Sequence, residues 1–356
     1  MSNFRSSLGG AVRAAALTAF VIGGASLGTP ALAQQPAPQQ AASTIDAIRA
    51  RGTLVCGVNT GLAGFAQPDS QGVWRGFDVD YCRAVAIALF NDASKVRYIP
   101  TTAQNRITAL QSGEVDMLAR NTTWTLSRDT SLGLDFAATT FYDGQGFIVK
   151  RSANVNHARE LDGATICVQP GTTTEQNLAD WARANNLRFT PVVIERLEDN
   201  LSAYLAGRCD AFTTDASGLA ASRAALANPN DHVILPEVIS KEPLAPAVRH
   251  GDQRFTDLVR WIHFGLLTAE ELGITSENVM QAVANDQRPD ARRLLGRTGE
   301  LGGMLGVDNA FMVSIIRTLG NYGEVFNRNL TPIGLQRGPN ALWTTPGGLQ
   351  YAPPFR

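Results

Sequence analysis

The sequence predicts an α/β protein in which two α/β units follow one another along the chain. Short apolar segments typical of strands alternate with segments whose apolar residues recur at helical spacing, and this alternation starts again near residue 165. The 356 residues are 44% hydrophobic and 18% charged, a composition that fits one or two globular domains. It excludes a disordered chain, a collagen-like chain and a multi-span membrane protein.

The first unit begins with a short capped helix over 44–51, which Gly52 ends. A strand is expected over 53–58, a helix over 78–90, a strand over 96–99, a helix over 105–112 and a strand over 115–119. The helix over 78–90 is predicted because one helical face gathers apolar side chains, namely Val79, Cys82, Val85, Ala86 and Leu89.

The second unit repeats this order. It is expected to contain strands over 165–168, 191–194 and 211–214, with helices over 174–185 and 200–207 between them. In both units one helix ends on glycine, Gly113 or Gly207, and the chain enters the next strand through an aspartate, Asp116 or Asp210. Such corners are common, so they support the fold class and nothing more.

Residues 1–33 have the layout of a secretory signal peptide. Arg5 and Arg13 precede an apolar run over 14–27, and Ala31-Leu32-Ala33 supplies small residues for cleavage. Cleavage leaves 323 residues with a formal charge of −3, and a segment rich in Gln, Pro and Ala over 34–43 then serves as a linker. No later stretch approaches about 18 apolar residues, so the mature protein is expected to be soluble. A retained N-terminal anchor is the alternative.

Charge and histidine content exclude several functions. Lys and Arg total 31 against 32 Asp and Glu, and no basic run suggests a nucleic-acid partner. The chain has four histidines, no H-E-x-x-H and no P-loop, and its G-x-S-x-G match over 24–28 lies in the signal peptide. We therefore expect no metal site, no cofactor and no enzyme of these classes.

The four cysteines are expected to form two disulfides, because an exported protein meets oxidising conditions and no C-x-x-C spacing is present. Three connectivities are possible. Pairing Cys56 with Cys82 and Cys167 with Cys209 is favoured, since each pair then lies within one half of the chain. Four free, buried thiols are the alternative.

Several motifs together resemble the polar-amino-acid-binding proteins of ABC importers. They are, in order, Gly76-Phe77-Asp78-Val79-Asp80, the segment 109–116, Thr125 with Arg128, the segment 161–163, Gly171-Thr172-Thr173-Thr174-Glu175, and Thr214-Asp215. The resemblance runs from about residue 45 to 248. The segments 321–324 and 348–354 resemble the general L-amino-acid-binding branch.

The resemblance implies a two-lobed periplasmic-binding-protein fold of type II with two hinge crossings, near 142–146 and 241–246. Lobe 1 would comprise 44–141 plus 247–300, lobe 2 would comprise 142–246, and a C-terminal extension over 301–356 would pack on lobe 1. It also implies a monomeric periplasmic receptor, not an enzyme, that captures free L-amino acids and delivers them to an inner-membrane ABC permease with its ATPase.

A site that binds a free amino acid needs a fixed cation or amide donors for the ligand carboxylate and a carboxylate for the ligand ammonium group. Arg128 resembles the family's arginine for the carboxylate, and Asn121 and Thr123 place further polar groups beside it. The alternative is a surface arginine paired with Asp129. Asp215 resembles the aspartate for the ammonium group, although an aspartate after a strand is often a turn or N-cap residue.

Thr172 and Thr173 stand where a strand gives way to a helix, which is a ready site for an anion. Thr172 and Glu175 also match a capping box that needs no ligand, and both interpretations can hold. By resemblance the two threonines would join Arg128 on the ligand carboxylate.

The neutral Asn59, at a position that is often acidic in relatives selecting cationic side chains, favours broad specificity, although it could equally cap a turn. Gln169 lies close enough in sequence to the Gly-Thr-Thr turn to touch a ligand.

Two other classes compete. Some periplasmic proteins of this fold are dehydratases of cyclic acids, and Glu175 would be the first candidate for a general acid. The sensor domain of a signalling receptor is disfavoured, because no apolar span follows the lobes.

Overall fold

The computed structural model describes residues 43–356. The predicted signal peptide, and the predicted linker up to residue 42, lie outside the described residues. Within the described part, no helix is both long and apolar enough to cross a membrane.

Lobe 1 contains a five-stranded sheet in the order β4 (Val96–Thr101), β1 (Leu54–Asn59), β5 (Met117–Leu118), β14 (Ala247–Arg249) and β6 (Leu134–Phe136). β1 is parallel to β4 and β5, whereas β14 is antiparallel to β5 and β6. The three predicted strands are present, with β5 shorter than predicted. Asn59 therefore stands at the carboxyl end of β1, where open α/β sheets bind ligands.

The helices of lobe 1 follow local signals. α1 (Thr44–Arg51) starts at Ser43, whose hydroxyl accepts the Ile45 N–H, and ends at Gly52 in the left-handed conformation. α2 spans Phe77–Phe90 and buries most of its side chains. The lobe also contains α3 (Arg106–Gln111), α4 (Leu126–Ser131), α8 (Gln253–Glu271) and the small hairpin of β2 (Gln67–Pro68) and β3 (Trp74–Arg75).

Lobe 2 contains a second five-stranded sheet in the order β10 (Thr190–Val193), β9 (Thr165–Val168), β11 (Ala211–Asp215), β8 (Gln145–Lys150) and β12 (His232–Ile234). β9 is parallel to β10 and β11, and β8 is antiparallel to its neighbours. Its helices are α5 (Thr173–Asn185), α6 (Leu197–Leu205) and α7 (Ala216–Ala224). α5 and α7 both begin at the carboxyl end of a strand, which brings their first residues toward the same edge of the sheet.

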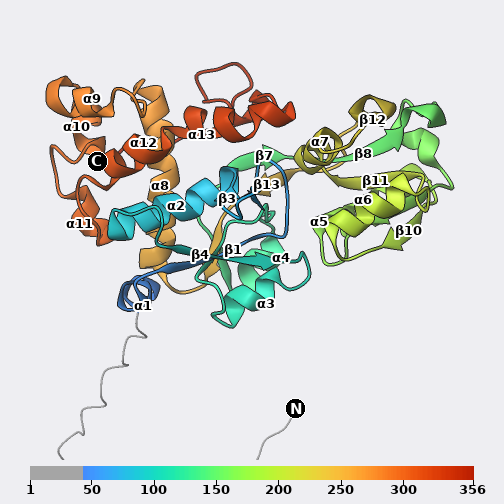
Figure 1. Cartoon of the computed structure of the whole chain (residues 1–356), viewed down its shortest axis with the longest axis horizontal. Coiled ribbons are helices and arrows are strands. Elements are labelled where there is room, and N and C mark those ends of the chain that lie inside the picture. The colour runs from blue at the N-terminus through green and yellow to red at the C-terminus, as the bar shows by residue number, and fades with distance from the viewer. Residues whose placement is uncertain (1–42) are drawn as a thin grey trace, which may run out of the picture. The chain divides into compact units, whose positions relative to one another are not determined.

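The chain crosses between the sheets twice. β7 (Phe141–Asp143) leads from β6 to β8, and β13 (Glu242–Leu244) leads from β12 back to β14. The two crossing strands pair antiparallel, with Glu242 opposite Asp143, and lie side by side in Figure 1. This confirms the two-lobed fold with two crossings. The residue boundaries of the lobes stay a prediction.

The segment after β14 adds helices to the apolar core of lobe 1. They are α9 (Val279–Asn285), α10 (Pro289–Leu294), α11 (Leu301–Leu305), α12 (Phe311–Leu319) and α13 (Tyr322–Asn329). Five short 3-10 turns complete the described chain, at Arg151–Ala153, Ala158–Leu161, Pro229–Asp231, Thr331–Ile333 and Gly338–Asn340.

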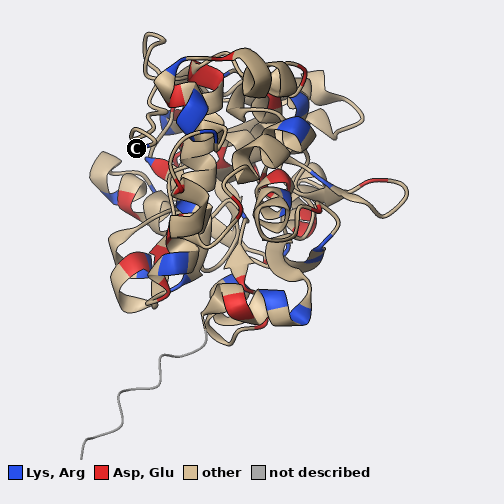
Figure 2. Cartoon of the chain, turned by 90° about the vertical axis from the view of Figure 1, so that its left-hand side faces the viewer, with Lys and Arg blue, Asp and Glu red and all other residues tan. Residues whose placement is uncertain are grey.

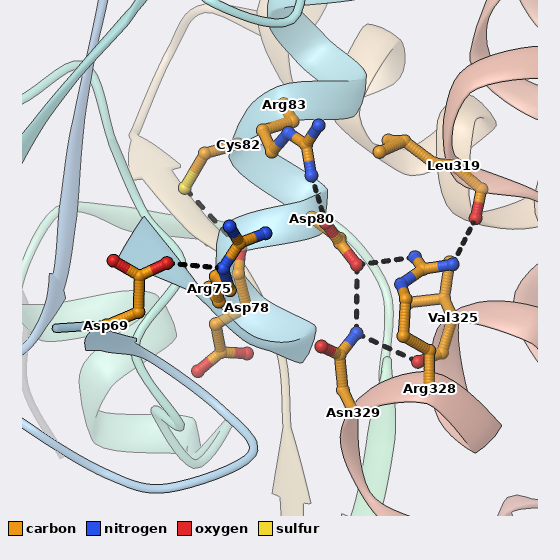
Figure 3. Close-up of polar contacts among 10 residues, drawn as sticks. All are labelled: Asp69, Arg75, Asp78, Asp80, Cys82, Arg83, Leu319, Val325, Arg328 and Asn329. Carbon is orange, nitrogen blue, oxygen red and sulfur yellow. Dashed lines mark hydrogen bonds and ion pairs between the residues drawn. The ribbon is translucent and has the colours of Figure 1, made fainter. Parts of the chain in front are cut away.

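A buried aspartate joins α13 to α2. Asp80 accepts hydrogen bonds from Arg328 at 2.6 Å and from Asn329 at 2.8 Å, and it also pairs with Arg83 on its own helix (Figure 3). Because Asp80 is almost fully buried, these partners satisfy a charge that would otherwise be costly. Figure 2, which faces the left-hand side of Figure 1, shows basic and acidic positions interspersed over the helices.

Both favoured disulfides are confirmed. Cys56 on β1 joins Cys82 on α2, with 6.1 Å between their Cα atoms. Cys167 on β9 joins Cys209, which follows α6, with 5.6 Å between their Cα atoms. All four cysteines are buried, and the alternative of free thiols is wrong.

Candidate ligand-binding site

Charged side chains are buried where the two lobes meet. Arg106, Arg120 and Arg128 are at most 6% exposed, and Asp215 and Glu242 are equally buried. Burial of charge is unfavourable unless a partner compensates it. A concentration of such groups at one place therefore marks a candidate site.

Arg128 lies in α4, which begins after Thr125, whose hydroxyl accepts the Arg128 N–H at 3.3 Å. The guanidinium donates from Nη1 to the Thr123 carbonyl at 3.0 Å. Desolvation lowers the pKa of Arg128, and the carboxylates of Glu242 and Asp215 act in the opposite direction. Among the described residues it forms no ion pair with Asp129, so it is not the paired surface arginine of the alternative.

Thr172 is the N-cap of α5. Its hydroxyl accepts the Glu175 N–H at 3.1 Å and donates to the Gln169 carbonyl at 2.8 Å. The Glu175 carboxylate accepts the Gly171 N–H at 3.1 Å rather than the Thr172 N–H. The cap is therefore formed through the threonine, while the glutamate holds the turn that precedes it.

Thr123 from lobe 1 and Thr173 from lobe 2 come together. Their hydroxyl oxygens are 3.3 Å apart, and both hydroxyls donate to the same oxygen of Glu242, at 2.6 Å and 2.9 Å respectively. Two of the predicted site residues thus meet across the lobes, at a glutamate that the sequence had not singled out.

Asp215 is the N-cap residue of α7 by position, but its side chain forms no capping hydrogen bond. Burial raises its pKa well above the ordinary value, and the nearby Asp143 and Glu242 raise it further. Arg106 and a hydrogen bond from Asn121 act in the opposite direction. The Asp215 carboxylate is thus not used to cap α7, and it lies close to two other acidic side chains, Asp143 and Glu242.

Asn59 and Asn121 are joined. The Asn59 amide donates to Asn121 Oδ1 at 3.0 Å, while Asn59 Oδ1 accepts the Gly61 N–H at 3.1 Å and so also holds a turn. Asn121 has a positive φ of 32°, and its N–H donates to Asp78 at 3.0 Å. The Asp78 bond helps to hold this uncommon backbone conformation next to Asp215.

Gln169 is held within lobe 2, because its amide donates to the Glu195 carbonyl at 2.8 Å. No hydrogen bond in residues 43–356 joins it to Arg128 or Asp215. Of the eight predicted ligand-binding residues, Gln169 and Thr172 thus form side-chain hydrogen bonds within lobe 2 alone.

Sequence reasoning missed Arg106, Asp143 and Glu242. Arg106 opens α3, and burial, reinforced by Arg120 and Arg128, lowers its pKa well below the ordinary value. Its Nε and Asp143 Oδ2 are buried without a hydrogen-bond partner in the described part of the chain. No motif marks Arg106, and Glu242 lies in a segment that the sequence identified only as a crossing.

Two sheets, two crossings and a buried charged centre between the lobes define a two-lobed solute-binding protein. Residues 54–277 match the family model of bacterial extracellular solute-binding proteins, family 3, and the chain belongs to that family. The resemblance found in the sequence is confirmed.

Relatives cover nearly the whole chain. A glutamate/glutamine/aspartate/asparagine-binding protein of Rhodobacter capsulatus is 57% identical over 92% of this chain and 98% of its own. A general L-amino acid-binding periplasmic protein of Rhizobium johnstonii is 54% identical over 88% and 93% of the two chains. An ABC transporter periplasmic binding protein from Brucella ovis, solved with glutathione bound, is 56% identical, with a TM-score of 0.86 over 88% of this chain and all of that one.

Proposed function

We propose that this protein is a periplasmic receptor that binds free L-amino acids with broad specificity between its lobes. It delivers them to an inner-membrane ABC permease with its ATPase, and it acts as a monomer without enzymatic activity. The observation that carries the proposal is the burial of Arg128 and Asp215, two opposite charges whose side chains have few partners inside the protein.

In this proposal Arg128 binds the ligand carboxylate, together with the backbone N–H groups of Thr172 and Thr173 at the start of α5, and Asp215 binds the ammonium group. Lobe 1 supplies the arginine and lobe 2 supplies the helix start and the aspartate. One small ligand that contacts both lobes favours their closure, because only the closed form offers all of these contacts.

The acids near Asp215 support the same ligand class. Burial raises the pKa of Asp143 to about 6, and Glu242 adds to the rise. An ammonium group placed among Asp143, Asp215 and Glu242 would offset their mutual repulsion. Only the cationic end of a ligand can provide this stabilisation. The relatives named for amino-acid binding agree with this assignment.

Breadth is supported by the Asn59–Asn121 pair, because neutral amides can donate to or accept from different ligand side chains. Arg106, with its unpartnered Nε, adds a cation to the same region and favours side chains that carry oxygen acceptors. The glutathione-bound Brucella ovis protein makes glutathione a useful probe of how large a ligand the site accepts.

The test is calorimetric titration of mature protein that has been unfolded and refolded to remove co-purified ligand. Each common L-amino acid, glutathione and a cyclic-acid dehydratase substrate are titrated separately. Saturable binding of chemically different amino acids supports the proposal. Binding of one amino acid alone contradicts breadth, and turnover of the cyclic acid would favour the dehydratase alternative with Glu175 as its acid.

A further inference from the structure

Glu242 opens the return crossing β13 and is 1% exposed. Its Oε2 accepts hydrogen bonds from the Thr123 and Thr173 hydroxyls, at 2.6 Å and 2.9 Å. Its Oε1 accepts from the Asn177 amide at 2.7 Å and from the Ser240 hydroxyl at 2.6 Å. The carboxylate therefore collects donors from lobe 1, from lobe 2 and from the crossing itself.

These four donors fill the carboxylate. An ionised carboxylate only accepts hydrogen bonds, and its two oxygens offer about four lone-pair positions. Each oxygen of Glu242 already has two donors, so little accepting capacity remains for a ligand. Glu242 thus acts on a ligand through its neighbours rather than by direct contact.

The neighbours that matter are the two threonines. A hydroxyl has one proton, and in both Thr123 and Thr173 that proton is directed to Glu242. Toward any third group, each hydroxyl can then only accept. The two side chains are turned into paired acceptors 3.3 Å apart, one from each lobe.

We propose that Glu242 is a positioning residue that binds the hydroxyl protons of Thr123 and Thr173 and so presents both oxygens as acceptors to the ligand ammonium group. The ligand carboxylate is then left to Arg128 and to backbone N–H groups at the start of α5. This inference rests on the proposed function, because it needs a ligand with an ammonium group.

The same contacts couple ligand recognition to closure. Thr173 and Asn177 lie one turn apart on α5 in lobe 2, whereas Thr123 lies in lobe 1. If the lobes separate, Glu242 must release either Thr123 or the pair on α5. The acceptor pair therefore exists only in the closed arrangement, and an ammonium group that binds it stabilises that arrangement.

The test compares ligands with and without the amino group. L-glutamate and glutarate, which lacks only that group, are titrated into wild-type, Glu242→Gln and a control, Glu237→Gln. The control removes a negative charge at a hydrogen-bonded glutamate elsewhere in lobe 2, where Glu237 accepts from His157 and Ala158. We expect E242Q to reduce the preference for L-glutamate over glutarate by about tenfold or more, and E237Q to leave it within about twofold.

A second pair of variants tests whether Glu242 acts through the hydroxyls. Thr123→Val with Thr173→Val removes both hydroxyls at similar shape and should reduce the same preference. In that background E242Q should have no further effect, because its carboxylate no longer has hydroxyl protons to bind. Thr173→Ser alone, which keeps the hydroxyl, should retain most of the preference. This comparison with the double-valine variant remains informative if circular dichroism shows that E242Q does not fold.

Four outcomes overturn the inference. Equal losses for L-glutamate and glutarate would mean that Glu242 supports the fold without selecting the amino group. An undiminished effect of E242Q in the double-valine background would mean that Glu242 does not act through the threonines. A wild-type protein that binds no amino acid would refute the proposed function and this inference together, whereas binding with an unchanged preference in E242Q would refute the inference alone.

Discussion

Arg128 and Asp215 keep hydrogen-bonding capacity that the fold does not use, which agrees with the ligand contacts proposed for them. Arg128 donates one side-chain hydrogen bond, to the Thr123 carbonyl, and Asp215 occupies an N-cap position without capping the helix. At most positions such polar groups would bond to the backbone or to water. Here both are buried, and their spare hydrogen-bonding capacity is the property that a zwitterionic ligand would use.

Replacement of Arg128 by alanine should weaken amino-acid binding at least 100-fold, equivalent to about 3 kcal/mol or more, because a desolvated carboxylate loses a paired cation. Lysine should recover only part of the loss, since it lacks the planar fork. Titration calorimetry measures both. An R128A protein with wild-type affinity would contradict the role of Arg128, and Asp129→Ala serves as the neighbouring control.

Binding of an amino acid should release a proton near pH 6. In the free protein, burial and neighbouring acids raise the pKa of Asp215 and bring that of Asp143 to about 6. A bound ammonium group favours the ionised carboxylates and lowers these pKa values. Protons therefore leave on binding, and affinity rises as the pH increases through this range.

Titrations in two buffers of different ionisation enthalpy would measure the proton release. Asp143→Asn should reduce it, because the amide neither titrates nor raises the pKa of Asp215. Proton uptake on binding, or an affinity that falls as the pH rises from 5 to 7, would contradict the assignment of the ammonium group to this acidic region.

Among the elements, α2 holds one segment of the candidate site in place. Asp78 in its first turn accepts the Asn121 N–H and so holds the segment that carries Asn121, Thr123 and, further on, Arg128. The sequence predicted the helix from its apolar face. It could not predict that Asp78 turns inward, because the acceptor's partner is 43 residues away in the chain.

Stability should fall as the pH rises, through Asp78. Burial raises its folded-state pKa to about 7, against 3.8 for an unperturbed aspartate. The folded state therefore holds the proton more tightly, and this contribution to stability is complete below about pH 4 and is lost as the pH rises through 7. Asp78→Asn, whose carbonyl still accepts the Asn121 N–H, should reduce the fall between pH 5 and 8 in denaturant titrations. An unchanged slope would refute this.

Elements with local signals were predicted well. β9 has the predicted bounds, and α5 begins at Thr173, one residue before the predicted start, as the capping signal predicted at Thr172 requires. The antiparallel strands β6, β8, β12 and β14 carry no such signal, since each is defined by pairing with a distant segment. The same reason explains why Arg106 and Glu242 were missed: their burial depends on which elements the fold brings together.

At the scale of the whole molecule, the segment after residue 300 reaches the first crossing. Asn340 accepts the Tyr142 N–H at 2.6 Å and donates to the Tyr142 carbonyl at 3.0 Å, so its side chain pairs with β7 as another strand would. The Tyr322 hydroxyl and the Gln350 amide both donate to the Thr140 carbonyl. We therefore infer that the C-terminal extension restrains one of the two crossings about which the lobes would move.

Asn340→Ala should loosen this crossing. It leaves the N–H and carbonyl of Tyr142 without their partner, so we expect a loss of about 1–3 kcal/mol in the free energy of unfolding. Because β7 is then less restrained, the ligand-free protein should also show a larger radius of gyration in X-ray scattering, and saturating amino acid should restore the wild-type value. Asn327→Ala, at an exposed position of α13, is the matched control.

The C-terminal extension and the ligand then act on the same equilibrium between open and closed lobes, the extension through β7 and the ligand through β13. The extension holds β7 on the side of lobe 1, while Glu242 on β13 joins Thr123 to α5 across the lobes. If Asn340→Ala lowers stability but leaves the ligand-free radius of gyration unchanged, the extension stabilises lobe 1 without governing closure. A larger radius that amino acid reverses would show that this family member sets the ease of closure partly through its C-terminal segment.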